Sequence, residues 1–134
     1  MTYLKLIVQI KKRTSFQKNQ MMNCIFCRII AGERPARIIH EDEHLLVFHD
    51  IQPQAPVHLL LVPKKHLTRI QDLTPGDKEL MGHLLFTARL VAEDQGLNQN
   101  GYRLVINNGR YGGQAVFHLH LHLLGGRPMH WPPG

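Results

Sequence analysis

Three histidines alternate with leucines near the carboxyl end of the chain, in the run His118-Leu119-His120-Leu121-His122. Side chains of a β-strand point alternately to opposite faces, so we expect the three imidazoles to share one face. Imidazolium groups this close together repel each other, which lowers their pKa values. A neutral imidazole can act as a nucleophile, a general base or a metal ligand. The run therefore predicts a reactive or metal-binding site.

A glycine-rich segment, Gly112-Gly113-Gln114, lies just before the histidine run. Glycine lets the backbone approach closely and adopt unusual φ values, so successive N–H groups can turn toward an anion. Most glycine pairs are plain turns, but the position of this pair beside three histidines favours a phosphate-binding loop. The two segments together predict a site that binds a phosphate group and acts on it.

Seven segments with helix or strand patterns would position these residues. Apolar residues at helical spacing predict a long helix, which Thr74 caps and Gly96 ends. The leucine face of the histidine run, which Phe117 extends, is expected to pack against it. The order of elements predicts an α+β fold, with an antiparallel five-stranded sheet and one long and one short helix on one face. The expected helices are Cys24–Ala31 and Pro75–Gln95, and the expected strands are Ala36–His40, Leu45–Phe48, Val57–Val62, Tyr102–Ile106 and Phe117–Leu124.

Positive charge is concentrated at the amino end of the chain. Five of the 16 basic residues fall within residues 1–20, which hold no acidic residue, and the other 11 nearly balance the 10 acidic residues. A nearly neutral body argues against a nucleic-acid-binding face. We expect residues 1–22 to form a disordered basic extension and residues 23–134 to form the folded domain. A transit peptide, or a start of translation at Met21 or Met22, would also account for the extension.

Hydropathy and cysteine content indicate the compartment. No apolar run approaches the roughly 18 residues that a membrane-spanning helix needs. The two cysteines, Cys24 and Cys27, do not make the disulfide framework of a small secreted protein. We therefore expect a soluble cytoplasmic protein with neither a membrane partner nor a nucleic-acid partner.

Several segments resemble the histidine-triad (HIT) superfamily, and its Hint-type branch in particular. The resemblance extends from Asn23 to Gly134, which would make residues 23–134 a HIT domain, and the histidine run is its most specific part. The Trp-Pro-Pro-Gly ending favours the Hint branch over the branch that acts on dinucleoside polyphosphates. The similar segments are 24–30 (CIFCRII), 48–56 (FHDIQPQAP), 62–66 (VPKKH), 112–122 (GGQAVFHLHLH) and 125–134 (GGRPMHWPPG).

The resemblance implies a hydrolase or transferase of the purine nucleoside phosphoramidase type, acting on substrates like adenosine 5′-monophosphoramidate. His120 would attack the α-phosphorus, and water would hydrolyse the covalent nucleotidyl-histidine. A backbone carbonyl nearby would fix the tautomer of His120. His122 would bond a non-bridging phosphoryl oxygen, while His118 and His58 would orient and tune the triad. A labile P–N bond suits such a two-step displacement, and no metal would be required.

The resemblance also implies nucleotide-binding residues and a homodimer. Asp50 would hold the ribose hydroxyls, and Ile51 would pack on the purine. Two protomers would join through the long helix and the Tyr102–Ile106 strand. Family members commonly carry serine or threonine where this chain has Ala115, so a hydroxyl that could help protonate the leaving amine is missing. The phosphate site would be lined by Asn107, Gly113, Gln114 and Ala115.

The Cys24-x-x-Cys27 pair raises the question of zinc, because thiolate pairs at this spacing are common zinc ligands. In some histidine-triad proteins the remaining ligands match His66 and His118, which leaves room for a structural zinc ion here. The alternative is that both cysteines are small buried hydrophobic residues. Lys64-Lys65 is interpreted as part of a charged turn rather than as a phosphate contact.

Two functions of other classes stay open. In one, His118, His120 and His122 hold a metal in a zinc-binding module, although such a site would need neither the glycine loop nor Asp50. In the other, the chain is a non-catalytic regulatory dimer that keeps nucleotide binding, and only Ala115 favours this function.

Overall fold

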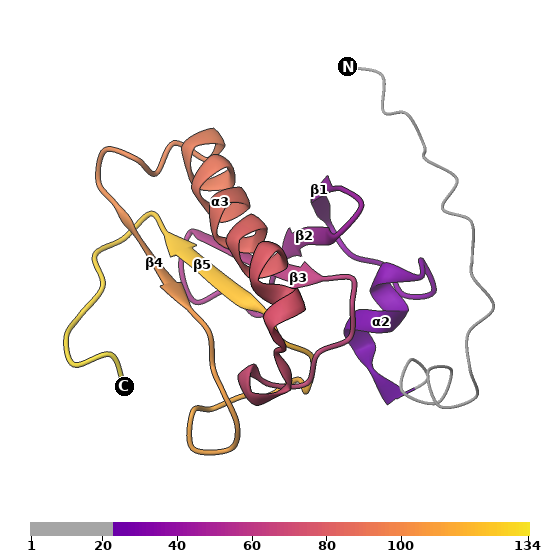
Figure 1. Ribbon diagram of the computed structural model, residues 1–134. Coiled ribbons are helices and arrows are strands. Elements are labelled where there is room, and N and C mark those ends of the chain that lie inside the picture. Colours follow the sequence, from indigo (N-terminus) through magenta and orange to yellow (C-terminus); the bar gives the residue numbers. More distant parts are fainter. Residues whose placement is uncertain (1–22) are drawn as a thin grey trace.

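The computed structural model describes residues 23–134, so the expected extension 1–22 lies outside the described residues (Figure 1). Within the described range, no helix is long and apolar enough to cross a membrane. The helices are α2 (Ile25–Ile30) and α3 (Lys78–Asp94), with short 3-10 helices at Ile70–Asp72 and Pro75–Asp77. The strands are β1 (Ile38–Glu41), β2 (Leu45–His49), β3 (Val57–Pro63), β4 (Tyr102–Val105) and β5 (Leu121–Gly125).

These five strands form one antiparallel sheet in the order β1-β2-β3-β5-β4. β5 is the last strand in sequence but lies inside the sheet, where Leu61 pairs with Leu121 on one side and Val105 pairs with His122 on the other. The end of the histidine run is therefore held between two neighbouring strands. The expected α+β fold, with a five-stranded antiparallel sheet and one long and one short helix, is confirmed.

Each face of the sheet carries its own apolar cluster. α3 packs on one face, which alternate residues of β2, β3 and β5 form, and it runs across the sheet in Figure 1. α2 packs on the opposite face, where Phe26 joins Leu46, Leu60 and Val62. The prediction that both helices share one face is therefore wrong. β2 and β3 are apolar at consecutive positions, so both of their faces need a cover.

The predicted cap at Thr74 begins the 3-10 helix Pro75–Asp77, and α3 itself begins three residues after the predicted start, at Lys78. The Thr74 N–H donates to the Asp77 carboxylate at 2.9 Å, and the Thr74 hydroxyl donates to the same oxygen at 3.2 Å. Pro75 occupies the first turn. This capping box satisfies backbone groups that a helix start leaves without partners.

Strand β5 begins at Leu121, four residues later than the predicted start at Phe117. The ladder between β3 and β5 ends at the pair Leu61–Leu121. Continued in this register, Val62 would face His120 and Pro63 would face Leu119, but neither pair is part of the ladder. Pro63 has no N–H to donate, so it could not extend the pairing. The residues before Leu121 therefore lie outside the sheet.

Residues 117–120 make other contacts instead. The Leu119 N–H donates to the Leu67 carbonyl at 2.6 Å, and His118 Nε2–H donates to the Pro63 carbonyl at 2.7 Å. The predicted alternation survives at Leu119, which is buried in the α3 cluster. It fails at Phe117, which is 57% exposed and does not join the core.

Candidate active site

The side chain of His120 is fixed by the backbone of its own segment. Its Nδ1 lies 2.7 Å from the carbonyl oxygen of His118, which can only accept, so Nδ1 carries the proton. The lone pair of the neutral ring then lies on Nε2. Phe26 of α2 meets this imidazole edge-on, with ring centroids 5.0 Å apart. His120 therefore presents a nucleophilic nitrogen in a fixed orientation.

A second series of hydrogen bonds fixes His122. The Gln54 N–H donates to His58 Nδ1 at 3.0 Å, so His58 carries its proton on Nε2. His122 Nδ1 lies 2.8 Å from that nitrogen, and Asp50 Oδ2 lies 3.3 Å from it. His122 Nδ1 therefore accepts, and the proton of His122 sits on Nε2. Within residues 23–134 this Nε2–H contacts no acceptor, which leaves it for a ligand.

Burial keeps these imidazoles neutral near pH 7. It lowers the pKa of His120, although the hydrogen bond to His118 opposes this effect. Burial, together with the charges of His120 and His58, lowers the pKa of His122 to about 4. Burial also lowers the pKa of His58, against the opposing effect of Asp50. The site thus combines an unprotonated nucleophile with a neutral N–H donor.

The loop between β2 and β3 brings Asp50 and Ile51 close to these histidines. One Asp50 oxygen accepts the Gln52 N–H at 2.8 Å, and the other lies 3.3 Å from His58 Nε2. Ile51 is 91% exposed although it is large and apolar. A single exposed isoleucine is ordinary on a protein surface. The contacts of Asp50 and Ile51 with a nucleoside stay a prediction.

Gln114 is buried and holds the glycine-rich loop in shape. Its Nε2 donates to the carbonyls of Thr68 and Val116, at 2.7 and 3.1 Å. Its Oε1 accepts the Gly109 N–H at 2.9 Å. Both amide hydrogens are therefore in use within the protein, and the side chain supports the loop from inside.

The two positions of this loop favour glycine for different structural reasons. A Cβ at Gly112 would lie 2.5 Å from the Asn108 carbonyl oxygen, so only glycine fits there. Gly113 has a φ of +79°, in the left-handed region that favours glycine. Asn107 is partly buried and Ala115 is exposed in the same segment. Their place in a phosphate site stays a prediction.

Four side chains that can bind metal meet on the other side of the triad. His118 Nε2 is protonated toward Pro63, so its Nδ1 lone pair faces Cys24 Sγ at 3.3 Å and Cys27 Sγ at 3.5 Å. His66 Nδ1 lies 3.1 Å from Cys27 Sγ. Neighbouring sulfur and nitrogen ligands of a tetrahedral zinc ion are about 3.5 Å apart at ordinary bond lengths. The four residues therefore fit a closed Cys2His2 site.

A second group, Asp50, His58 and His122, also places potential ligand atoms within 4.8 Å of one another. A metal on His58 Nε2 would move the ring proton to Nδ1, where it would meet the N–H of Gln54. This group is therefore a hydrogen-bonded relay. His120 belongs to neither group of potential ligands in the described residues. The described residues therefore give no support to a metal ion held by all three histidines of the run.

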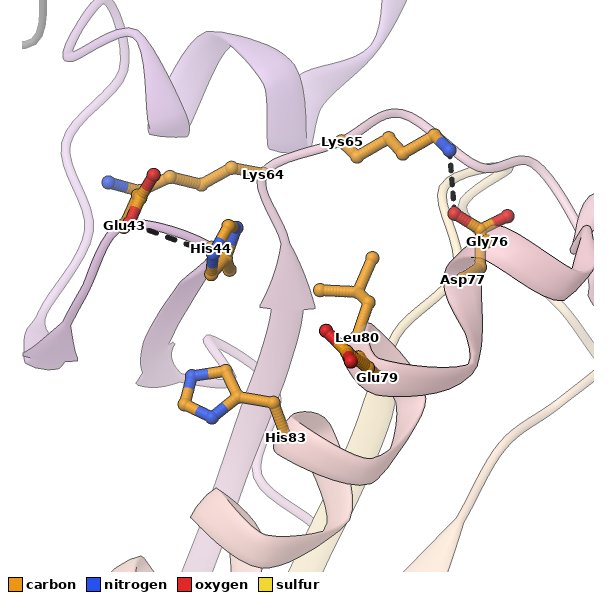
Figure 2. A pocket seen from close by; sticks show the side chains of 9 residues that line it. All are labelled: Glu43, His44, Lys64, Lys65, Gly76, Asp77, Glu79, Leu80 and His83. Atoms are coloured by element: carbon orange, nitrogen blue, oxygen red, sulfur yellow. Dashed lines mark hydrogen bonds and ion pairs between the residues drawn. The ribbon is translucent and has the colours of Figure 1, made fainter.

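A cavity of about 500 Å³ lies apart from these residues, between the β1–β2 turn, the end of β3 and the start of α3 (Figure 2). Lys65 reaches the carboxylate of Asp77 at 2.6 Å, as Figure 2 shows. Lys64 pairs with Glu41 at 2.9 Å. Both lysines thus form ion pairs within the protein, and their interpretation as part of a charged turn stays a prediction.

The fold and the site define a histidine-triad protein: a five-stranded sheet supplies the last histidine of the run, and the two preceding ones are fixed by backbone carbonyls. Residues 31–129 match the HIT domain, and the chain belongs to this family. It is 57% identical over 110 residues to an uncharacterized HIT-like protein from Synechocystis sp. The aligned region covers 82% of this chain and 96% of that protein.

Solved structures of histidine-triad proteins are similar to this chain. A HIT family hydrolase from Legionella pneumophila is similar with a TM-score of 0.82 and 54% identity, over 84% of this chain and all of that one. A Zn-bound histidine triad family protein from Mycobacterium smegmatis is similar with a TM-score of 0.69 and 36% identity, over 80% of this chain and 77% of that one.

Proposed function

We propose that this chain is a nucleotide hydrolase of the purine nucleoside phosphoramidase type and acts through a covalent nucleotidyl-histidine on His120. One observation carries the proposal: the fixed tautomers give His120 a lone pair at Nε2 and give His122 an N–H at Nε2. Displacement at phosphorus needs a nucleophile and a donor to the non-bridging oxygens. Similarity to a HIT family hydrolase supports hydrolytic chemistry.

The reaction would proceed in two displacements. In the first, His120 Nε2 forms a bond to the α-phosphorus while the substrate P–N bond breaks, and the leaving amine takes a proton from solvent. In the second, water attacks the same phosphorus, the bond to His120 breaks, and nucleoside monophosphate and a proton are released. His122 Nε2–H stabilises the charge on a non-bridging oxygen in both steps.

The nucleotide would lie along the β2–β3 loop and the glycine-rich loop. Asp50 would accept hydrogen bonds from the ribose hydroxyls, and Ile51 would cover the purine. His118 and His58 would orient the other two histidines of the triad rather than contact the substrate, because their ring nitrogens are bonded within the protein. The phosphate would lie near Asn107, Gly113, Gln114 and Ala115.

Intact-mass analysis of the protein, acid-quenched during turnover of adenosine 5′-monophosphoramidate, tests this function. We expect one adenylyl group per chain during turnover and release of AMP with ammonia. A protein that binds AMP but neither cleaves the substrate nor gains mass would instead be a non-catalytic nucleotide-binding protein, the function that Ala115 favours.

Ala115→Ser is expected to raise turnover of phosphoramidates with basic amine leaving groups. A basic amine cannot leave as an anion, so it must receive a proton in or before the transition state. A serine hydroxyl could relay that proton, whereas the alanine methyl group cannot. General-acid contacts contribute about a hundredfold or more, but solvent already supplies the proton here, so we expect a gain of several-fold, below about tenfold.

The matched measurement for this variant is the steady-state rate for an amine substrate and for a nitrophenyl ester. A phenol of low pKa leaves without protonation, so its rate should stay unchanged. An equal effect on both substrates, or none on either, would remove position 115 from the mechanism.

We also propose a structural zinc ion held by Cys24, Cys27, His66 and His118. Hydrogen bonding from Cys27 and His118 lowers the pKa of the Cys24 thiol far below its usual range, although burial opposes the shift. Thiolates are the form that binds metal. When bound, the ion would tie α2 to the segments that hold His66 and His118. The similarity to a Zn-bound relative supports this proposal.

A homodimer is the proposed assembly. The outer surface of α3 exposes three large apolar side chains: Leu85 is 59%, Phe86 56% and Leu90 46% exposed. The edge strand β4 lies at one end of the sheet, next to β5. A second copy that covered α3 and extended the sheet at β4 would bury this apolar surface and the free strand edge together.

Replacing Phe86 with aspartate is therefore expected to give a monomer in sedimentation-velocity runs at micromolar concentration, where the unaltered protein should be a dimer. Ile38→Asp is the control, because Ile38 is 47% exposed but lies on β1, at the opposite edge of the sheet. A monomeric unaltered protein would contradict the proposed assembly, and so would dissociation by the control substitution alone.

A further inference from the structure

The segment that follows β5 reaches back to the loop between β2 and β3. Arg127 lies two residues after the strand ends, and its Nε and Nη2 donate to the Gln54 carbonyl at 3.0 and 2.9 Å. Gly126 allows this approach: its φ is +90°, and a Cβ there would lie 2.8 Å from the Pro56 Cβ. The chain thus passes close against the loop before the arginine contacts it.

Within residues 23–134, every hydrogen bond that Arg127 donates is to a backbone carbonyl. The third nitrogen, Nη1, donates to the Pro128 carbonyl at 2.9 Å. A guanidinium that served as a phosphate ligand would leave its planar fork open to the anion. Here the side chain instead connects two segments of the protein, and among the described residues it makes no hydrogen bond to a histidine of the triad.

Gln54 links this contact to the triad. Its N–H donates to His58 Nδ1 at 3.0 Å, and His58 Nε2–H donates to His122 Nδ1 at 2.8 Å. A neutral imidazole can carry its proton on either nitrogen, and the hydrogen bonds around it decide which one. Asp50 Oδ2, in the same loop, lies 3.3 Å from His58 Nε2 and favours the same tautomer. The tautomer of His122 thus depends on two groups of the β2–β3 loop, the Gln54 N–H and the Asp50 carboxylate, and Arg127 holds this loop from the other side.

We propose that Arg127 is a positioning residue for His122. By holding the Gln54 carbonyl, it keeps the Gln54 N–H on His58 Nδ1, and His122 consequently keeps its proton on Nε2. If the loop were released, His58 could carry its proton on Nδ1, and His122 could then do the same. A lone pair would face the anionic phosphate where a donor is needed. The effect on catalysis rests on the proposed function, whereas the effect on the tautomers does not.

Two substitutions at position 127 separate this role from simple packing. Arg127→Met keeps a long side chain but removes every donor, and Arg127→Lys restores one donor. Arg103→Met is the matched control, since Arg103 Nη2 also donates to a backbone carbonyl, that of His130 at 2.7 Å, but does not contact Gln54. Ring-nitrogen NMR spectra of 15N-histidine-labelled protein report the tautomers of His58 and His122, and steady-state rates on a phosphoramidate report kcat.

In the unaltered protein and in Arg103→Met, we expect His122 in the Nε2–H form. In Arg127→Met, a measurable fraction of the Nδ1–H form should appear and kcat should fall about tenfold, since small misplacements of catalytic groups have effects of this size or larger. Arg127→Lys should recover part of both. Unchanged spectra in Arg127→Met, or an equal change in Arg103→Met, would overturn the proposal. If the spectra change as expected but the unaltered protein cleaves no phosphoramidate, the proposed function fails and the positioning role stands.

Discussion

Replacing His120 with asparagine should lower the turnover of adenosine 5′-monophosphoramidate by at least about a thousandfold, because loss of a nucleophile removes the reaction path itself. Asparagine is the informative choice. Its amide N–H can replace the Nδ1–H that donates to the His118 carbonyl, while the nucleophilic Nε2 is absent. The substitution therefore removes the chemistry and retains the local hydrogen bond.

Binding distinguishes this outcome from misfolding. AMP should bind the His120→Asn protein with an affinity that calorimetry can measure, and the adenylyl adduct should be missing from its mass spectrum. His44→Asn is the control, because His44 lies in the cavity of Figure 2, away from the triad. Turnover within a few-fold of the unaltered protein would mean that the nucleophile is another residue.

The sequence was sufficient for much of the fold because its patterns were locally unambiguous. The capping residues Thr74 and Asp77 marked the 3-10 helix that leads into the long helix, and turn-forming residues separated the strands. The histidine run was found by residue type alone. Its alternation placed Leu119 in the core correctly, even though the strand itself begins only at Leu121.

Other features depend on contacts between distant segments. Nothing in the local pattern distinguishes Phe117 from the leucines that follow, yet it lies before the first residue of β5, outside the β3–β5 ladder, and is exposed. The apolar strands β2 and β3 suited burial on both faces, but they did not indicate which helix covers which face. The relay through Gln54 was also missed, since a backbone N–H leaves no mark in the sequence. The one available signal was Arg127, a charged residue directly after two glycines at a strand end.

The proposed zinc ion leads to the second large expected effect. Protein purified without chelator should contain about one zinc ion per chain by elemental analysis, and Cys24→Ala should contain almost none. A ligand that binds only the folded state at about a thousand times its dissociation constant stabilises it by about 4 kcal/mol. For a domain of this size we therefore expect the variant to unfold roughly 10 °C or more below the unaltered protein.

Alanine at position 24 tests the two interpretations of the cysteines against each other. If Cys24 were only a small buried hydrophobic residue, alanine would cost about 1 kcal/mol, and the loss would not depend on metal. If the four residues bind zinc, chelator should destabilise the unaltered protein and leave Cys24→Ala unchanged. His66→Ala should behave like Cys24→Ala, and His44→Ala, which alters a histidine outside the group, should keep the metal. A Cys24→Ala protein that still contains one zinc ion per chain, or an unaltered protein whose stability does not change with chelator, would contradict the zinc proposal. Neither result would bear on His120 as the nucleophile.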